Sequence, residues 1–225
     1  MSAESTLPPG TVIAVDGPAA SGKGSLGRRL AVHFGFAYLD TGLLYRATGR
    51  KLLKQGIDLA DSAAAVDAAC DLGLDDLCPA ILRDDEIAYA AGVVAAHPGV
   101  RKALIGLQQR FAAQPPDGAP GAVLDGRDIG TVICPDAQIK LFIEASIEVR
   151  VRRRHKELQA RGLKSIYSRV LRDMRERDAR DRSRAVAPLV PADDACVLDT
   201  TEFDEDSVFR SALAFISSRT PFNSE

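Results

Sequence analysis

The chain has 225 residues, of which 46% are hydrophobic and 27% are charged, and its formal net charge is −2. These values are ordinary for a globular protein, and the length suits one domain that carries a small insertion. A charge so close to zero does not indicate a surface that binds nucleic acid or an anionic membrane. No apolar run reaches the length of about 18 residues that a membrane-spanning helix needs.

Cysteine and histidine are few and lie far apart in the sequence. The four Cys form no C-x-x-C pair and the three His are equally scattered, so no zinc site is predicted. The first ten residues contain neither the basic nor the apolar part of a signal peptide. We therefore expect a reduced, cytoplasmic protein whose thiols are incidental.

The first half of the chain predicts two strands and three helices around one insertion. The strands are short and apolar, and the helices repeat apolar side chains on one face. Residues 61–92 are rich in Ala and Asp and predict a small insertion with a weak core. The predicted strands cover residues 11–16 and 36–40, and the predicted helices cover residues 22–34, 43–55 and 98–113.

The second half predicts three further strands and three further helices. Residues 114–121 are a surface turn rich in Pro and Gly, and residues 126–136 are expected to form an irregular loop. Alternating strands and helices predict an α/β fold with a five-stranded parallel sheet and helices on both faces. The predicted strands cover residues 122–125, 139–143 and 195–199, and the predicted helices cover residues 146–161, 165–177 and 204–217.

A glycine-rich segment joins the first strand to the first helix and fits the phosphate-loop pattern G-x-x-x-x-G-K. Backbone N–H groups of such a loop surround a phosphate, the helix N-terminus adds positive charge, and the lysine follows the γ-phosphate during transfer. A glycine-rich turn without a ligand is the alternative. The predicted ATP-binding residues of this loop are Gly17, Pro18, Ala19, Ala20, Ser21, Gly22, Lys23, Gly24 and Ser25.

The hydroxyl that usually follows the lysine of such loops is displaced by one residue. Gly24 occupies that position and Ser25 comes next, as in nucleoside monophosphate kinases rather than GTPases. Without that hydroxyl, Mg²⁺ is expected to be held by phosphate oxygens and waters, with Asp125 contacting it through water. The alternative is that Asp125 is only a turn residue.

Two segments at strand ends suggest a second phosphate site. Thr41 and Arg46 follow the second strand, where Thr41 is also a plausible helix cap and Arg46 suits bidentate binding of a phosphate. Arg127 and Asp128 follow the third strand, at the sheet edge where ligands bind in open α/β folds. Arg127 could hold an acceptor phosphate and Asp128 an exocyclic amine, although a solvated charged turn is possible.

Residues 150–184 hold twelve Arg and two Lys against five acidic residues. Solvated helices with ion pairs explain many of these charges, and nucleic-acid binding is disfavoured because aromatic residues are almost absent. The preferred interpretation is a mobile lid that brings arginines to the transferring phosphoryl group. So many arginines favour a phosphorylated acceptor, whose dianionic oxygen needs alignment and charge neutralisation but no general base.

Four segments together resemble the bacterial cytidylate kinases, and they span nearly the whole chain. They begin at Ile13 with the phosphate loop, at Tyr38-Leu-Asp-Thr-Gly, at Asp125-Gly-Arg-Asp-Ile-Gly, and at Arg175-Glu-Arg-Asp-Ala-Arg-Asp-Arg-Ser-Arg. The resemblance implies a single phosphate-loop kinase domain over residues 1–225, with an acceptor-binding insertion at about 61–92 and a lid at about 150–184. It also implies transfer of the ATP γ-phosphate to CMP or dCMP, with Mg²⁺, by a monomer.

The resemblance further assigns roles to individual residues. Lys23, Arg127, Arg177 and Arg184 are expected to act in catalysis, and Arg153 and Arg154 to lie in the lid over ATP. The acceptor nucleotide is expected to contact Thr41, Arg46, Arg101, Arg127, Asp128, Asp181 and Arg184. The insertion is shorter than is usual in the family, and Gly92 stands where relatives can offer a serine to the base, so other acceptors such as UMP or AMP remain open. A regulator that uses ATP only as a conformational ligand is a third possibility, but it would need no second phosphate site.

Overall fold

A computed structural model describes residues 7–82, 84–184 and 186–219 of the chain. The fold divides into two compact units, which we name the sheet unit (Met1–Leu39 with Pro115–Glu225) and the helical unit (Asp40–Gln114). No helix among the described residues is both long and apolar enough to span a bilayer.

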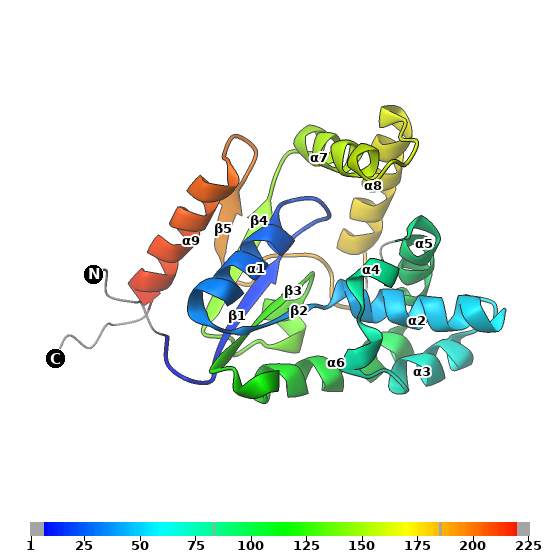
Figure 1. The fold of residues 1–225 in the computed structure, drawn as a ribbon, viewed down its shortest axis with the longest axis horizontal. Helices are drawn as coiled ribbons and strands as arrows, with labels where there is room; N and C mark the ends of the chain where they lie inside the picture. Colours follow the sequence, from blue (N-terminus) through cyan, green and yellow to red (C-terminus); the bar gives the residue numbers. More distant parts are fainter. Residues whose placement is uncertain (1–6, 83, 185, 220–225) are drawn as a thin grey trace. The chain divides into compact units, whose positions relative to one another are not determined.

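The sheet unit is built on a five-stranded parallel sheet with the order β2-β3-β1-β4-β5. β1 lies in the middle and pairs with β3 from Thr11↔Gly121 to Asp16↔Gly126, and with β4 from Ile13↔Ile139 (Figure 1). The strands are β1 Thr11–Asp16, β2 Ala37–Asp40, β3 Gly121–Gly126, β4 Ile139–Glu144 and β5 Cys196–Asp199. The parallel sheet predicted from the sequence is therefore confirmed.

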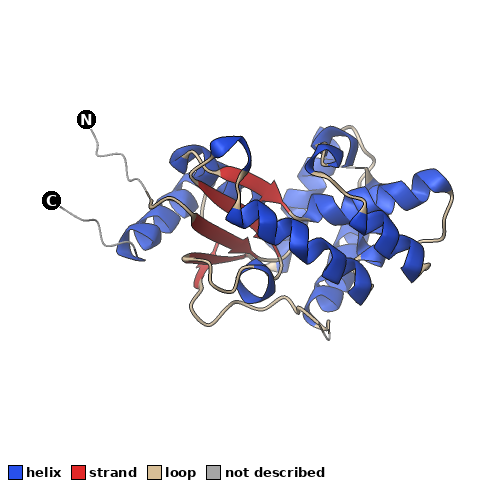
Figure 2. Cartoon of the chain, turned by 90° about the horizontal axis from the view of Figure 1, so that it is seen from below, coloured by secondary structure: helices blue, strands red, loops and turns tan. Residues whose placement is uncertain are grey.

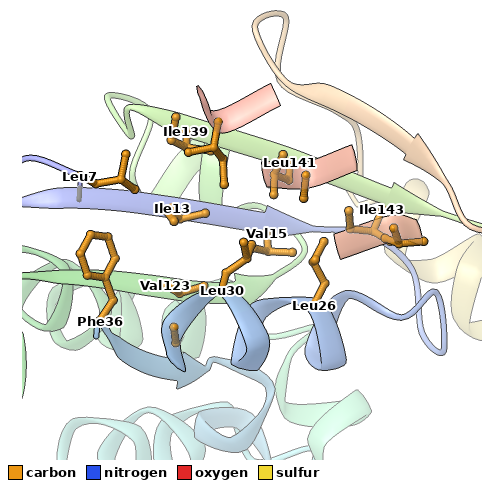
Figure 3. Packing of buried hydrophobic residues seen from close by; sticks show 14 residues of the cluster. Leu7, Ile13, Val15, Leu26, Leu30, Phe36, Val123, Ile139, Leu141 and Ile143 are labelled. Carbon is orange, nitrogen blue, oxygen red and sulfur yellow. The ribbon is translucent and has the colours of Figure 1, made fainter. Parts of the chain in front are cut away.

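Two helices of the sheet unit, α1 Lys23–Phe34 and α9 Glu205–Arg219, pack along these strands, which are red in Figure 2. The unit also contains α7 Ile147–Ala160 and α8 Tyr167–Arg182, with the short turns η2 Pro116–Gly118 and η3 Ile129–Ile133. α1 contacts α9, and α7 contacts α8. Figure 3 shows Leu26 and Leu30 of α1 facing Val15 and Val123 of the strands in the buried core. Because parallel strands end at one edge, the loops after β1 and β3 share that edge.

Two expectations about this unit are wrong in detail. The helix expected at residues 165–177 begins at Tyr167 and continues to Arg182, because Asp178 and Asp181 in its last turns are buried against arginines. The segment expected to be irregular after β3 contains the π-helical turn η3. Backbone N–H groups of that turn are held by a carboxylate from β1, a contact that the local sequence does not reveal.

The helical unit has its own core. Its elements are α2 Gly42–Gln55, α3 Ser62–Cys70, η1 Leu74–Asp76, α4 Pro79–Leu82, α5 Asp85–Val94 and α6 Pro98–Ala113. Buried leucines from α2, α4 and α6 meet in this core, among them Leu44, Leu52, Leu82 and Leu104. The segment predicted as an insertion at residues 61–92 thus forms helices within a larger unit.

Candidate active site

The loop between β1 and α1 has the backbone shape that its glycines predict. Gly17 has φ +150°, and an added Cβ there would lie 2.1 Å from the carbonyl oxygen of Ile143 on β4. Gly22 precedes α1 with φ 99° and Ala20 lies in the left-handed region with φ 59°. Only a residue without a side chain fits at Gly17, so the loop can pass tightly over the sheet edge. The N-terminus of α1 then leaves N–H groups at the loop for an anion.

Lys23, the predicted catalytic lysine, lies in the first turn of α1 and is held by a buried carboxylate. Its Nζ is 2.9 Å from Oδ1 of Asp125, which is only 2% exposed at the end of β3. The hydroxyl of Tyr38 on β2 donates to Oδ2 of Asp125 at 2.9 Å. Asp125 therefore joins β2 and β3 to the first turn of α1. Sequence reasoning did not assign a role to Tyr38, although it lies in one of the family-like segments.

The carbonyl of Ser21 in the loop is hydrogen-bonded by residues of α7 and of the segment after β5. It accepts hydrogen bonds from Arg153 Nη1 at 3.2 Å and from Thr200 Oγ1 at 2.8 Å. Arg153 also donates from Nη2 to the carbonyl oxygen of Thr200 at 2.7 Å. The sequence predicted that Arg153 lies at the ATP site, and the structure places it against the loop. Thr200, directly after β5, was missed because its contact is 179 residues away in the chain.

Arg150 and Arg154 come from the same helix α7 but lie in different surroundings. Arg150 is 3% exposed and donates to the carbonyl of Ala19 in the phosphate loop and to both carboxylate oxygens of Asp178 on α8. Arg154 pairs with Glu157 one turn along the helix, with 2.9 Å between Nη1 and Oε1. Of the predicted lid arginines, Arg150 and Arg153 thus contact the phosphate loop, whereas Arg154 forms an ion pair at the surface of α7.

The predicted acceptor residues of the sheet unit cluster around Asp181. Arg127 Nε donates to Oδ2 of Asp181 at 3.0 Å, and Arg184 Nη2 donates to Oδ1. Burial alone would raise the pKa of Asp181, but three surrounding guanidinium groups outweigh it and hold the pKa below its usual value. They belong to Arg127, Arg184 and Arg177. The structure thus brings together three arginines expected to act in catalysis and an aspartate expected to contact the acceptor nucleotide.

Asp128 begins the turn η3 and is 7% exposed. Its carbonyl accepts from the N–H groups of Val132 at 2.9 Å and Ile133 at 3.1 Å. Asp128 directly follows Arg127, so both residues occupy the short link between β3 and η3. The structure therefore places this predicted base-contacting carboxylate beside the predicted phosphate-binding arginine.

The remaining predicted acceptor residues lie in the helical unit. Thr41 is buried at the start of α2 and makes no capping hydrogen bond with its side chain there. Arg46 on α2 donates from Nη1 to the carbonyl of Leu82 at 2.9 Å. The guanidinium carbon of Arg101 on α6 lies 5.6 Å from the ring centroid of Tyr45. These three residues come from the two longest helices of their unit, near the starts of α2 and α6.

Asp125 is the residue predicted to contact Mg²⁺ through water. Among the described residues, no group of three or more Asp, Glu, His or Cys side chains converges as a metal site would require. Asp125 offers buried carboxylate oxygen next to the lysine of the phosphate loop, and Mg²⁺ prefers such oxygen donors and keeps several of its waters. The donor type therefore fits a metal that arrives with a nucleotide.

Comparison with known proteins agrees with this geometry. Residues 13–218 match the profile of the family described as cytidylate kinase. The cytidylate kinase of Paramagnetospirillum magneticum is 62% identical over 93% of this chain and 99% of its own length. That of Methylocella silvestris is 59% identical over 92% of this chain and 94% of its own length.

A solved structure supports the fold alone. An uncharacterized protein from Eubacterium ventriosum superposes with a TM-score of 0.53 at 14% identity, covering 92% of this chain and 99% of the other. The family match spans both the phosphate loop and the Arg127–Asp181–Arg184 cluster. The chain belongs to the cytidylate kinase family.

Proposed function

We propose that the protein transfers the γ-phosphate of ATP to CMP or dCMP, giving ADP and CDP or dCDP. One observation carries the proposal. Asp125 at the end of β3 holds Lys23 of the phosphate loop, and Arg127, two residues later, joins the cluster around Asp181. The lysine that binds the donor phosphate and the arginine that binds the acceptor phosphate are therefore anchored at the same strand end, which supports the closeness of the two phosphates that in-line transfer requires.

On the donor side, the backbone N–H groups of Gly17 and residues 19–22 bind the β- and γ-phosphates, and Lys23 follows the γ-phosphate during transfer. Arg153, held on the loop carbonyl of Ser21, and Arg154 neutralise phosphate charge from α7. Mg²⁺ bound to ATP neutralises phosphate charge, and Asp125 is the residue that would contact its waters.

On the acceptor side, Arg127, Arg177 and Arg184 neutralise the acceptor phosphate and the phosphoryl group in transfer. An acceptor oxygen forms the new bond to the γ-phosphorus as the bond to the β–γ bridging oxygen breaks and ADP leaves. That oxygen is already ionised, so no general base is required. The family resemblance assigns the ribose to Thr41 and Asp181, the acceptor phosphate also to Arg46, and the cytosine to Arg101 and Asp128.

An ADP-release assay with CMP, dCMP, UMP, AMP and GMP tests this function. We expect turnover with CMP and dCMP that exceeds turnover with AMP and GMP. Absence of turnover with every acceptor would refute a kinase, and equal rates with AMP and CMP would refute the cytosine assignment in favour of a broader monophosphate kinase.

A pair of variants tests the acceptor site. Arg127→Ala should lower kcat/KM for CMP at least about a hundredfold, because it removes a charge-assisted contact made to the reacting phosphates. Cys134→Ala, at the end of η3, should change it only a few-fold. Equal losses in the two variants would contradict the proposed acceptor site.

We also propose that the protein is a monomer in the cytoplasm. All four cysteines are free thiols, which suits a reducing compartment. Size-exclusion chromatography with light scattering should give a mass near 24.0 kDa, and a mass twice as large would refute the monomer.

A further inference from the structure

Asp16 is a buried carboxylate that the proposed mechanism does not use. It is the last residue of β1, directly before Gly17, and is 5% exposed. Its Oδ1 accepts the N–H of Ile129 at 2.9 Å and its Oδ2 accepts the N–H of Gly130 at 2.8 Å. Both hydrogen bonds cross more than a hundred residues of sequence, so they join the phosphate loop to the start of η3.

The position of these bonds relative to Arg127 is specific. Asp16 pairs with Gly126 in the β1–β3 ladder, and its side chain holds the N–H of Ile129. Between these two attachment points lie only Arg127 and Asp128. One residue of β1 therefore fixes both ends of the two-residue link that carries the predicted acceptor contacts.

The surroundings of Asp16 make its charge costly. The pKa of Asp16 is raised to about 7, mainly by burial and to a lesser extent by the charges of Asp128 and Asp125, while the two N–H groups act in the lowering direction. The pKa of the Cys134 thiol is raised mainly by burial, and the charge of Asp16 also raises it. Lys140 on β4 packs its side chain against Gly130 and directs its Nζ to Asp194. Burying a carboxylate in such surroundings costs free energy, and the role that explains its presence is to hold the N–H groups of Ile129 and Gly130 in place.

We propose that Asp16 is a positioning residue for the acceptor nucleotide, which holds the Arg127–Asp128 link at the distance from the phosphate loop that transfer requires. The inference rests on the proposed function, because the acceptor roles of Arg127 and Asp128 are assigned there. Asp16 itself touches neither substrate. It acts through the backbone of Ile129 and Gly130.

The variant Asp16→Asn tests the proposal, because the amide keeps the shape but turns an NH₂ donor toward one of the two backbone N–H donors. We expect the KM for CMP to rise about tenfold or more, with the KM for ATP within about twofold of the wild type. Asp16→Glu keeps the charge but displaces it. It should raise the KM for CMP by a smaller factor and again leave the KM for ATP nearly unchanged.

A purely structural role would give a different result, since it would lower the stability and affect both substrates alike. Asp204→Ala is the matched control, because Asp204 is another carboxylate that accepts a backbone N–H, from Ser207 at 2.7 Å at the start of α9. It should lower the melting temperature and leave both KM values unchanged. Equal rises in the two KM values of Asp16→Asn, or failure of both Asp16 variants to fold, would overturn the proposal.

The double variant Asp16→Asn with Arg127→Ala separates this inference from the proposed function. If Asp16 acts through the link, the double variant raises the KM for CMP by less than the product of the two single effects. A rise in the KM for CMP equal to the product of the two single effects would overturn the positioning role of Asp16. If Arg127→Ala alone leaves the KM for CMP unchanged, the acceptor assignment itself fails, whatever Asp16→Asn does.

Discussion

Gly17 is the residue at which the backbone of the phosphate loop has the least freedom. Its φ of +150° and the 2.1 Å approach of Ile143 oxygen to an added Cβ leave no room for a side chain. Gly17→Ala must therefore displace either the loop or β4. We expect the KM for ATP to rise more than about tenfold and the melting temperature to fall by several degrees.

The matched control is Gly35→Ala at the end of α1. Gly35 also has positive φ, at +65°, but nothing lies within 4 Å of an added Cβ. Its substitution should cost about 1 kcal/mol of stability from backbone strain alone and leave the KM for ATP unchanged. Similar ATP kinetics in the two variants would contradict a specific steric requirement at Gly17.

The raised pKa of Asp16 also has a consequence for stability. Its folded-state pKa of about 7 lies above the ordinary value of 3.8, so the folded state binds the proton more tightly than the unfolded state. The contribution of this group to stability therefore falls as the pH rises from about 4 to about 7 and is constant above that range. Between pH 5 and pH 8 the loss should be about 2–3 kcal/mol.

Urea unfolding at the two pH values, with wild type and Asp16→Asn side by side, measures this contribution. The wild type should lose more stability than the variant on going from pH 5 to pH 8. An identical loss would show that Asp16 titrates alike in the folded and unfolded states.

The residues that sequence reasoning found and missed differ in how far their partners lie along the chain. Residues 17–25 and Arg127–Asp128 could be predicted, because each short segment contains its own chemical pattern. The contacts of Asp16 and Thr200 join residues 113 and 179 positions apart, and no local pattern encodes them. The sequence signals for Asp16 were its place at the end of an apolar strand and its inclusion in the family-like segment that begins at Ile13.

Among the elements, α7 and α8 share an apolar cluster and are also joined by one buried ion pair. Arg150 donates to Asp178 at 3.1 Å and 2.6 Å through two nitrogens, and both side chains are buried. Asp178→Ala would leave the guanidinium buried without its countercharge. We expect a loss of about 3–5 kcal/mol of unfolding free energy, measured by urea denaturation.

A second ion pair, between two residues of α7, serves as the control. Glu157 pairs with Arg154 at 2.9 Å but has a side chain that is 48% exposed, where solvent screens the attraction. Glu157→Ala should therefore cost less than about 1 kcal/mol. A loss for Asp178→Ala that is no larger than this would mean that the buried pair does not hold α8.

The same pair explains why the end of α8 was not predicted. The charged sequence from Arg177 to Arg182 has no apolar stripe, so periodicity gives no reason to continue a helix through it. In the structure its inner face is made of Asp178 and Asp181, each paired with arginine from outside the helix or just beyond its end. Charged partners take the place of apolar packing there, and only the fold supplies them.

At the scale of the whole molecule, the two units have separate cores. Leu52 lies in the core of the helical unit and Ile13 in that of the sheet unit, and each is fully buried. Leu52→Ala should cost about 2–5 kcal/mol and speed amide hydrogen exchange throughout α2, α3 and α6. Protection in β1, β3 and β4 should change far less. Uniform acceleration across both units would show that they unfold as one.

The hydrogen bonds of Arg150 also tie the α7–α8 pair to the phosphate loop. One guanidinium ties the carbonyls of Ala19 and Ala145 to the carboxylate of Asp178, close to the phosphate loop. We therefore expect the lid motion proposed for residues 150–184 to displace the turn around Leu163 further than the end of the pair near Arg150. A spectroscopic label at Leu163 should report a larger displacement on ATP binding than one placed beside Arg150, and equal displacements would contradict an anchor at Arg150.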